Sequence, residues 1–200
     1  MAIHLRDVRE QDLDSVLALN NAAGSSILAL DYAAIRCHFE QAGYFRVAEV
    51  DGLLAGFLIA YTADADYESP NFRWFQQRYQ AFLYIDRIVV ASTRRGSGLG
   101  RVFYADVTGF AEVRVPLLAC EVFLEPRNDV AVLFHGTYGF HEVGQQLMPG
   151  VGRRVSLLAK DLCSFAYVRE TFIDRGGLPD VPWLAARERP STDPQRATGT

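Results

Sequence analysis

Apolar positions recur along this chain with two periods, and each period predicts one kind of element. Alternation with period two, or a short unbroken apolar run, predicts strands over 3–8, 44–50, 53–60, 82–90, 117–123, 140–147 and 153–160. Spacings of three and four residues predict helices over 11–22, 31–43, 99–110, 130–138 and 162–173, with a further short helix after Pro70. Elements in this order predict an α+β (mixed α/β) domain built around one twisted sheet.

Turns and chain ends divide the sequence further. Asp51 and Gly52 stand alone between two strand-like runs and predict a tight type I′ hairpin, because both residue types tolerate positive φ. The last 22 residues hold four of the eight prolines and almost no large apolar side chain after Trp183. We therefore expect a domain over 1–160, a helical extension over 161–178 and a disordered tail over 179–200.

Composition and charge narrow the classes of function. Of the 200 residues, 50% are hydrophobic and 22% are charged, which suits one globular core. The formal net charge of -4 argues against a nucleic-acid partner. The 3 cysteines are widely spaced, so we expect reduced thiols and no metal site. The longest apolar run, 53–61, is too short to cross a bilayer. We expect a cytoplasmic protein, monomeric or homodimeric, with no membrane partner.

The segment 84–101 carries the strongest chemical signal in the chain. A strand-like run leads into a turn containing Gly96, Gly98 and Gly100, whose backbone can approach a ligand without interference from a Cβ atom. The turn opens directly onto a helix, whose first N–H groups favour an anion. Arginines at 94, 95 and 101 add positive charge. The pattern predicts a phosphate-bearing ligand; a glycine turn that only joins strand to helix is the alternative.

Two common phosphate motifs do not fit this turn. A P-loop needs Gly-Lys-Ser/Thr, whereas the chain has Gly100 followed by Arg101. A dinucleotide fingerprint needs G-x-G-x-x-G after the first strand, and this turn follows about the fourth. A general nucleotide-binding protein is therefore the weakest of the interpretations.

The turn resembles the acetyl-CoA signature of the GNAT (GCN5-related) N-acetyltransferases. Their pattern Gln/Arg-x-x-Gly-x-Gly/Ala is matched by Arg95-Gly96-Ser97-Gly98-Leu99-Gly100, after the strand ending Ile88-Val89-Val90. A second family signature, Asn-x-x-Ala-x-x-Leu/Phe-Tyr-x-x-x-Gly-Phe, is similar to the stretch from Asn128 to Phe140. The resemblance covers about residues 3–160. The stretches 19–21, 67–75 and 82–87 are similar to a bacterial subgroup of predicted acetyltransferases.

This resemblance implies a GNAT fold: one twisted mixed sheet of six to seven strands, with a splayed central strand pair and flanking helices. It implies acetyl-CoA as the cofactor, with the pyrophosphate on backbone amides of the turn and the pantetheine arm paired with the fourth strand. The residues implied are Arg95, Gly96, Ser97, Gly98, Leu99, Gly100 and Arg101 in the turn, Ile88, Val89 and Val90 in the strand, and Asn128 and His135 downstream.

Three residues are candidates for the acid–base chemistry. His135 stands where the family often has the tyrosine that protonates the leaving thiolate, and an imidazolium could do the same; a packed histidine without a role is the alternative. Glu121 lies inside an apolar run, where an unpaired carboxylate is costly. Asp86 shares strand parity with Ile88 and Val90, which would place it on the cofactor side. Either carboxylate could instead bridge to an arginine such as Arg87, and the proton could leave through water without a dedicated base.

The acceptor side of the site is less defined. Seven aromatic residues between 67 and 84 either wall an amine pocket or, more simply, form core and loop packing. Cys120 is expected to be core rather than a nucleophile. The leading hypothesis is an acetyl-CoA-dependent N-acetyltransferase in which a primary amine, on a small molecule or a peptide, attacks the thioester directly. The alternative is a GNAT module that binds acyl-CoA for a regulatory role without efficient catalysis.

Overall fold

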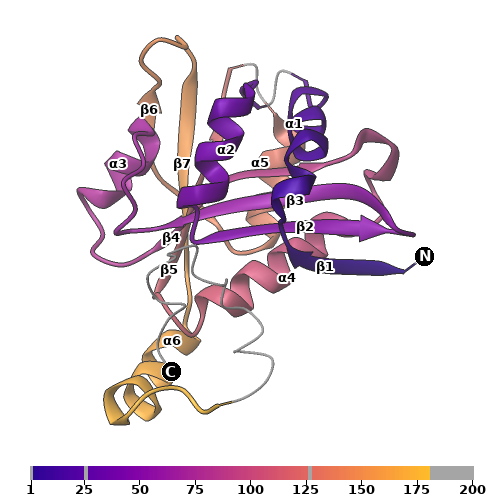
Figure 1. The fold of residues 1–200 in the computed structure, drawn as a ribbon. Helices are drawn as coiled ribbons and strands as arrows, with labels where there is room; N and C mark the ends of the chain where they lie inside the picture. Colours follow the sequence, from indigo (N-terminus) through magenta and orange to yellow (C-terminus); the bar gives the residue numbers. More distant parts are fainter. Residues whose placement is uncertain (1, 25–26, 126–127, 181–200) are drawn as a thin grey trace.

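The computed structural model describes residues 2–24, 27–125 and 128–180, which form one seven-stranded sheet with helices on both faces (Figure 1). The strands lie in the order β1-β2-β3-β4-β5-β7-β6. Their bounds are β1 Ile3–Asp7, β2 Tyr44–Val50, β3 Leu53–Thr62, β4 Leu83–Val90, β5 Leu117–Phe123, β6 His141–Leu147 and β7 Arg154–Asp161.

The helices begin and end close to the predicted positions. Their bounds are α1 Leu13–Asn21, α2 Tyr32–Gln41, α3 Pro70–Gln76, α4 Leu99–Ala111, α5 Asp129–Thr137 and α6 Ser164–Thr171, with 3-10 turns η1 Glu10–Asp12, η2 Ser92–Arg94 and η3 Ile173–Arg175. Asp31 caps α2, its side chain accepting from the Ala34 amide at 2.8 Å. The hairpin predicted at Asp51 is also present, with positive φ at both turn residues.

The sheet is mixed because β4 and β5 run parallel, whereas the other neighbouring pairs are antiparallel. In the described residues this parallel pairing covers the positions from Leu83↔Leu118 to Ile85↔Cys120. Beyond those positions β4 continues to Val90 and β5 to Phe123 without pairing to each other. The predicted splayed central pair is therefore confirmed, and it begins at Asp86 and Glu121.

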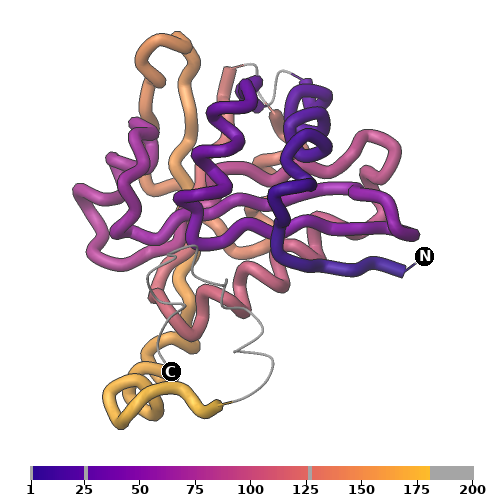
Figure 2. Tube along the Cα trace, in the orientation of Figure 1, coloured from indigo at the N-terminus to yellow at the C-terminus, as the bar shows by residue number. Residues whose placement is uncertain are grey.

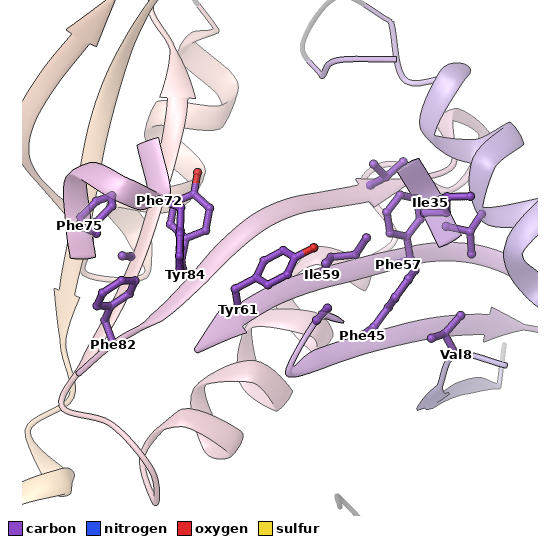
Figure 3. Packing of buried hydrophobic residues seen from close by; sticks show 14 of the residues in the cluster. Val8, Ile35, Phe45, Phe57, Ile59, Tyr61, Phe72, Phe75, Phe82 and Tyr84 are labelled. Carbon is purple, nitrogen blue, oxygen red and sulfur yellow. The ribbon is translucent and has the colours of Figure 1, made fainter. Parts of the chain in front are cut away.

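Each face of the sheet buries its own core. On one face, α1, α2 and α3 contribute residues such as Val16, Ile35 and Phe72. On the other, α4 contributes Phe103 and Val107, and α5 packs against them. The predicted loop aromatics are mostly core: Phe72, Phe75, Phe82 and Tyr84 are fully buried. Figure 3 shows the two from α3 beside Phe82, which precedes β4, and Tyr84 of β4.

The end of the described chain lies apart from the first two helices. α6 and η3 follow β7 at the opposite end of the sheet from the β6–β7 connection (Figure 2). These helical turns fall within the predicted extension, whereas the tail predicted over 179–200 lies outside the described residues from 181 onward. Within the described ranges, the structure contains no helix of the length and apolarity needed to span a membrane.

Candidate active site

A cavity of about 960 Å³ runs through the gap where β4 and β5 separate. One end is lined by the turn before α4 and by α5, on the face that α4 and α5 cover. The other end is lined by the segment after α1, by the residues leading into α3 and by Met148, on the opposite face. The open strand pair therefore connects the two faces of the sheet through a single cavity.

The exposed edge of β4 forms one wall of this cavity. From Arg87 to Val90 the strand pairs with β3 on one side, and β5 has already diverged on the other. The side chains of Asp86 and Arg87 are only 5% and 8% exposed, although both residues as a whole are half-buried. Their accessible atoms are therefore mainly backbone atoms. Such an edge can pair with an extended ligand in the manner of an added strand.

The glycine turn gives one end of the cavity an uncapped helix start and three arginines, features that favour an anion. Gly98 is the N-cap of α4 and has φ of 88°, a left-handed conformation that favours glycine. No side chain caps the helix, and its first α-helical bond runs from the Val102 amide to the Gly98 carbonyl at 3.1 Å. The amides of the first turn therefore lack helical partners. Arg94, Arg95 and Arg101 line the same end.

The three glycines of the turn have different roles. Gly96 and Gly98 both have positive φ, and the space beside each is open. Gly100 is inside α4, where a Cβ atom would lie 3.0 Å from the Phe134 ring of α5. Gly100 also lines the cavity, and its small size has a second effect, since it lets two helices pack closely. Ser97 does not line the cavity, and its hydroxyl donates to the Arg94 carbonyl at 2.6 Å.

Glu121 lies at the centre of the cavity, at the first position of β5 beyond the pairing with β4. Burial raises the pKa of Glu121 to about 7, and the negative charge of Asp86 acts in the same direction. The Tyr84 hydroxyl donates a hydrogen bond to this carboxylate, and the Asn71 side chain also stabilises its charged form. A carboxyl group titrating near neutral pH can both accept and return a proton there.

Asn71 is held in one orientation behind Glu121. It is fully buried near the start of α3, and its Oδ1 accepts a hydrogen bond from Gln146 Nε2 at 3.1 Å. The buried NH₂ group of Asn71 makes no hydrogen bond in the described residues, but its partial positive charge favours the charged form of Glu121. Residues from β4, β5, α3 and the β6–β7 hairpin thus form the surroundings of the Glu121 carboxyl group.

Asp86 lies on the same face as Glu121, not on that of Ile88 and Val90. The register of β3 with β4 shifts between Ile59 and Ala60, so β4 carries an extra residue at this point. The shift places Asp86 and Arg87 both on the α1 and α3 face. The predicted strand parity was therefore wrong, because a bulge interrupts the alternation. The predicted bridge is present: Arg87 Nε donates to Asp86 at 2.6 Å.

The family model for the "Acetyltransferase (GNAT) family" matches residues 13–140. The chain belongs to the GNAT acetyltransferase family. Its fold is similar to solved structures of low identity, and at that identity the likeness concerns the fold alone. No curated protein sequence matches this chain.

Three of these structures illustrate the likeness. The ribosomal-protein-S18-alanine N-acetyltransferase from Escherichia coli has 16% identity and a TM-score of 0.63, covering 80% of this chain and 94% of that one. Ard1 from Thermoplasma volcanium has 17% identity and a TM-score of 0.66, covering 81% and 99%. Arabidopsis thaliana Naa50, in complex with the bisubstrate analogue CoA-Ac-MVNAL, has 15% identity and a TM-score of 0.63, covering 80% and 99%.

His135 occupies the position of the frequent GNAT tyrosine and lines the cavity, but it is buried. Its Nδ1 lies 2.7 Å from the Ala131 carbonyl, which only accepts, so Nδ1 carries the proton. Burial lowers the pKa of this imidazole, and the hydrogen bond to Ala131 opposes that shift. The ring is therefore neutral at pH 7, with Nε2 unprotonated.

The remaining predicted residues fall at the cofactor end or in the core. Ile88, Val89, Val90 and Asn128 line the cavity. Asn128 also caps α5, accepting from the Ala131 amide at 3.1 Å. Cys120 is buried, as predicted, and burial raises the pKa of its thiol well above the usual value. In the described residues there is no cluster of potential metal ligands, so nothing in them indicates a metal centre.

Sequence reasoning missed the residues that hold the two carboxylates. Tyr67 donates to Asp86 at 2.5 Å and stacks on Tyr61, with ring centroids 4.0 Å apart. Neither Tyr67 nor Asn71 has a spacing that connects it to a residue on β4 or β5. The apolar wall at residues 23, 27, 28 and 148 was missed for the same reason, since its members are brought together only by folding.

Arg87 ties the carboxylate pair to the segment after α1. Besides the bond to Asp86, its Nη1 donates to Asn20 Oδ1 at 2.9 Å and to the Leu28 carbonyl at 3.4 Å. Burial disfavours the charge of Asp86, but the Arg87 guanidinium keeps the pKa of that carboxyl below its usual value. Asp86 is therefore ionised in the site.

We predict that Arg87→Met lowers the free energy of unfolding by about 3–5 kcal/mol, because it leaves the buried Asp86 charge uncompensated. Urea denaturation at pH 7 measures the change. The control is Arg36→Met, which breaks an exposed pair with Glu40 and Glu10 and should leave the unfolding midpoint nearly unchanged. Equal behaviour of the two variants would contradict the compensating role of Arg87.

Proposed function

We propose that this GNAT protein is an acetyl-CoA-dependent N-acetyltransferase in which a primary amine attacks the thioester directly. One observation carries the proposal: a single cavity joins the uncapped start of α4 to a carboxyl group that titrates near pH 7. An anion-binding end and a proton-accepting centre in one space suit a phosphate-bearing acyl donor and an amine acceptor.

The cofactor end has features that fit CoA. The open first-turn amides of α4, with Arg94, Arg95 and Arg101, would hold the pyrophosphate. The backbone of Ile88–Val90 would pair with the pantetheine arm, since that edge of β4 faces the cavity. Both placements follow the expectation for GNAT proteins. When bound, acetyl-CoA supplies the acyl group and the leaving thiolate.

Glu121 is the proposed general base. An amine reaches the site mainly as an ammonium ion, and it must lose a proton before its nitrogen can attack. Glu121 accepts that proton as a carboxylate, while Tyr84 and Asn71 keep it directed at the cavity. As the N–C bond forms, the C–S bond breaks and the electron pair leaves on sulfur, and the second proton that the nitrogen must lose passes, directly or through water, to the thiolate. Asp86 remains ionised, paired with Arg87 and Tyr67, and its negative charge raises the proton affinity of Glu121.

Protonation of the leaving thiolate by His135 stays a prediction. The surroundings of the ring disfavour the protonated imidazole that this role needs. An imidazole that donates from Nδ1 to Ala131 and is neutral at pH 7 has no proton to give from Nε2. We therefore propose that His135 serves mainly as part of the wall beside the cofactor.

We expect His135→Phe to raise the Kd for acetyl-CoA more than it lowers kcat, because the ring fills the wall but holds no transferable proton. Calorimetry and steady-state kinetics measure the two effects. A 100-fold loss of kcat with unchanged Kd would instead establish the acid role.

The function is tested by following release of free CoA thiol from acetyl-CoA across a panel of primary amines. Amine-dependent release, with mass spectrometry showing one added acetyl group, supports the proposal. Tight CoA binding without turnover on any amine would favour the alternative, an acyl-CoA-binding module. Preferential binding of ATP or NAD over CoA would overturn the assignment of the cofactor end.

A further inference from the structure

The acceptor end of the cavity has an unusual balance of side chains. Its walls are apolar at Ala23, Ile27, Leu28, Pro70 and Met148, and Tyr67 also lines this end. The only acidic side chains that line this end in the described residues are Asp86 and Glu121. An ammonium group therefore finds negative charge at the strand gap, and the carbon skeleton attached to it meets apolar walls.

The positive charge near this end is already engaged. Arg87 is the one cation that lines it among the described residues, and its charge is paired with Asp86, while its Nη1 donates to Asn20 and to the Leu28 carbonyl. The arginines of the turn lie beyond the end of β4, which extends roughly 13 Å from Asp86 to Val90. A carboxylate next to the acceptor amine would therefore be buried without a cationic partner, close to a second carboxylate.

The approach to this end is also negatively charged. Asp64, Asp66 and Glu68 are exposed in the segment leading to α3, where Tyr67 and Ser69 alternate with them and line the cavity. Asp66 lies 3.5 Å from Arg73, an exposed pair. Anions are disfavoured at this approach and cations are favoured.

We propose that the acceptor is a primary amine with an apolar carbon skeleton and no carboxylate beside the amine. This inference rests on the proposed function. It excludes free amino acids as good acceptors and favours apolar alkyl or arylalkyl amines. Residues on one face of the sheet produce this selectivity: carboxylates at the strand gap, apolar side chains beyond it and an arginine whose charge is paired with Asp86.

Matched acceptors test the inference. In the thiol-release assay, 3-methylbutylamine is compared with L-leucine, and 2-phenylethylamine with L-phenylalanine; each pair differs by one carboxylate. The amino acid is the weaker base of each pair, so the fraction of neutral amine alone would favour it. We expect kcat/KM to be at least about 100-fold higher for the simple amines, since the acid must bury an unpaired charge.

A variant that supplies the missing cation provides a second measurement. Ile27→Arg should raise the leucine/3-methylbutylamine ratio of kcat/KM at least tenfold, because the new guanidinium can pair with the carboxylate. Leu53→Arg, at a 70% exposed position of the β2–β3 hairpin, should leave that ratio unchanged. Unfolding midpoints show whether both variants are folded. If either is not, the inference is tested by the wild-type kcat/KM ratios of the two matched acceptor pairs.

The outcomes separate the two proposals. Turnover with similar kcat/KM for the amino acids and the simple amines would overturn the inference and leave the acetyltransferase function standing. CoA binding without turnover on any amine of the panel would overturn the proposed function, and the inference with it.

Discussion

Glu121→Gln is expected to lower kcat by about 10²–10⁴-fold, the usual contribution of a positioned general base. The amide keeps the shape of the carboxyl group and can still accept from Tyr84, but it cannot take a proton from the ammonium ion. Because Glu121 lies at the strand gap and not at the glycine turn, the Kd for acetyl-CoA should change less than threefold. Steady-state kinetics and calorimetry measure the two quantities.

The pH dependence follows from the same group. The base must be a carboxylate, and the pKa of Glu121 is about 7. In the wild type, kcat/KM should therefore rise with pH up to about 7 and fall roughly tenfold per pH unit well below it. The Glu121→Gln variant should lose this limb of the profile.

Glu125→Gln is the matched control, since Glu125 is exposed and does not line the cavity. It should keep both the rate and the pH limb of the wild type. A Glu121→Gln variant with wild-type kcat and an unchanged pH profile would show that the proton leaves by another route, such as ordered water.

Gly98→Val is expected to weaken CoA binding by about tenfold to 100-fold while the domain still folds. At φ of 88°, a β-branched residue is strained by roughly 1–2 kcal/mol or more. The turn relieves this strain by moving, which displaces the uncapped amides at the start of α4 from the anion. Calorimetric titration with CoA and with inorganic pyrophosphate measures the loss.

Gly52→Val provides the control for strain alone. Gly52 has φ of 82° and open space beside it, as Gly98 does, but it lies in the β2–β3 hairpin. The two variants should lose similar free energies of unfolding, and only Gly98→Val should lose CoA affinity. Equal CoA affinity in both variants would remove the glycine turn from the cofactor site.

Several features of this protein could be predicted from sequence because they are local. The periods of two and 3.6 place apolar side chains on one face of a strand or helix, so the elements and their order follow from the pattern. The turn at Gly96 and Gly98 is likewise local, because positive φ and an uncapped helix start depend on adjacent residues. Family membership could be inferred from the same segment, and the family model confirms it.

The arrangement of the site depends on residues distant in sequence. Asp86 lies on the face that α1 and α3 cover because β3 and β4 pair through a bulge. The alternation of side chains along β4 alone predicted the face that α4 covers. Glu121 has a pKa near 7 because folding buries it and brings Asp86, Tyr84 and Asn71 around it. These contacts join β4, β5 and α3, which are separated in the sequence.

Sequence alone thus determined the order of elements and the glycine turn, since each follows from the preferences of neighbouring residues, and the family resemblance added the splayed pair. Only the tertiary structure decided which carboxyl group has a pKa near 7 and which side chains line the cavity around it. Burial and charge–charge distances set both, and neither exists until the strands have paired and separated.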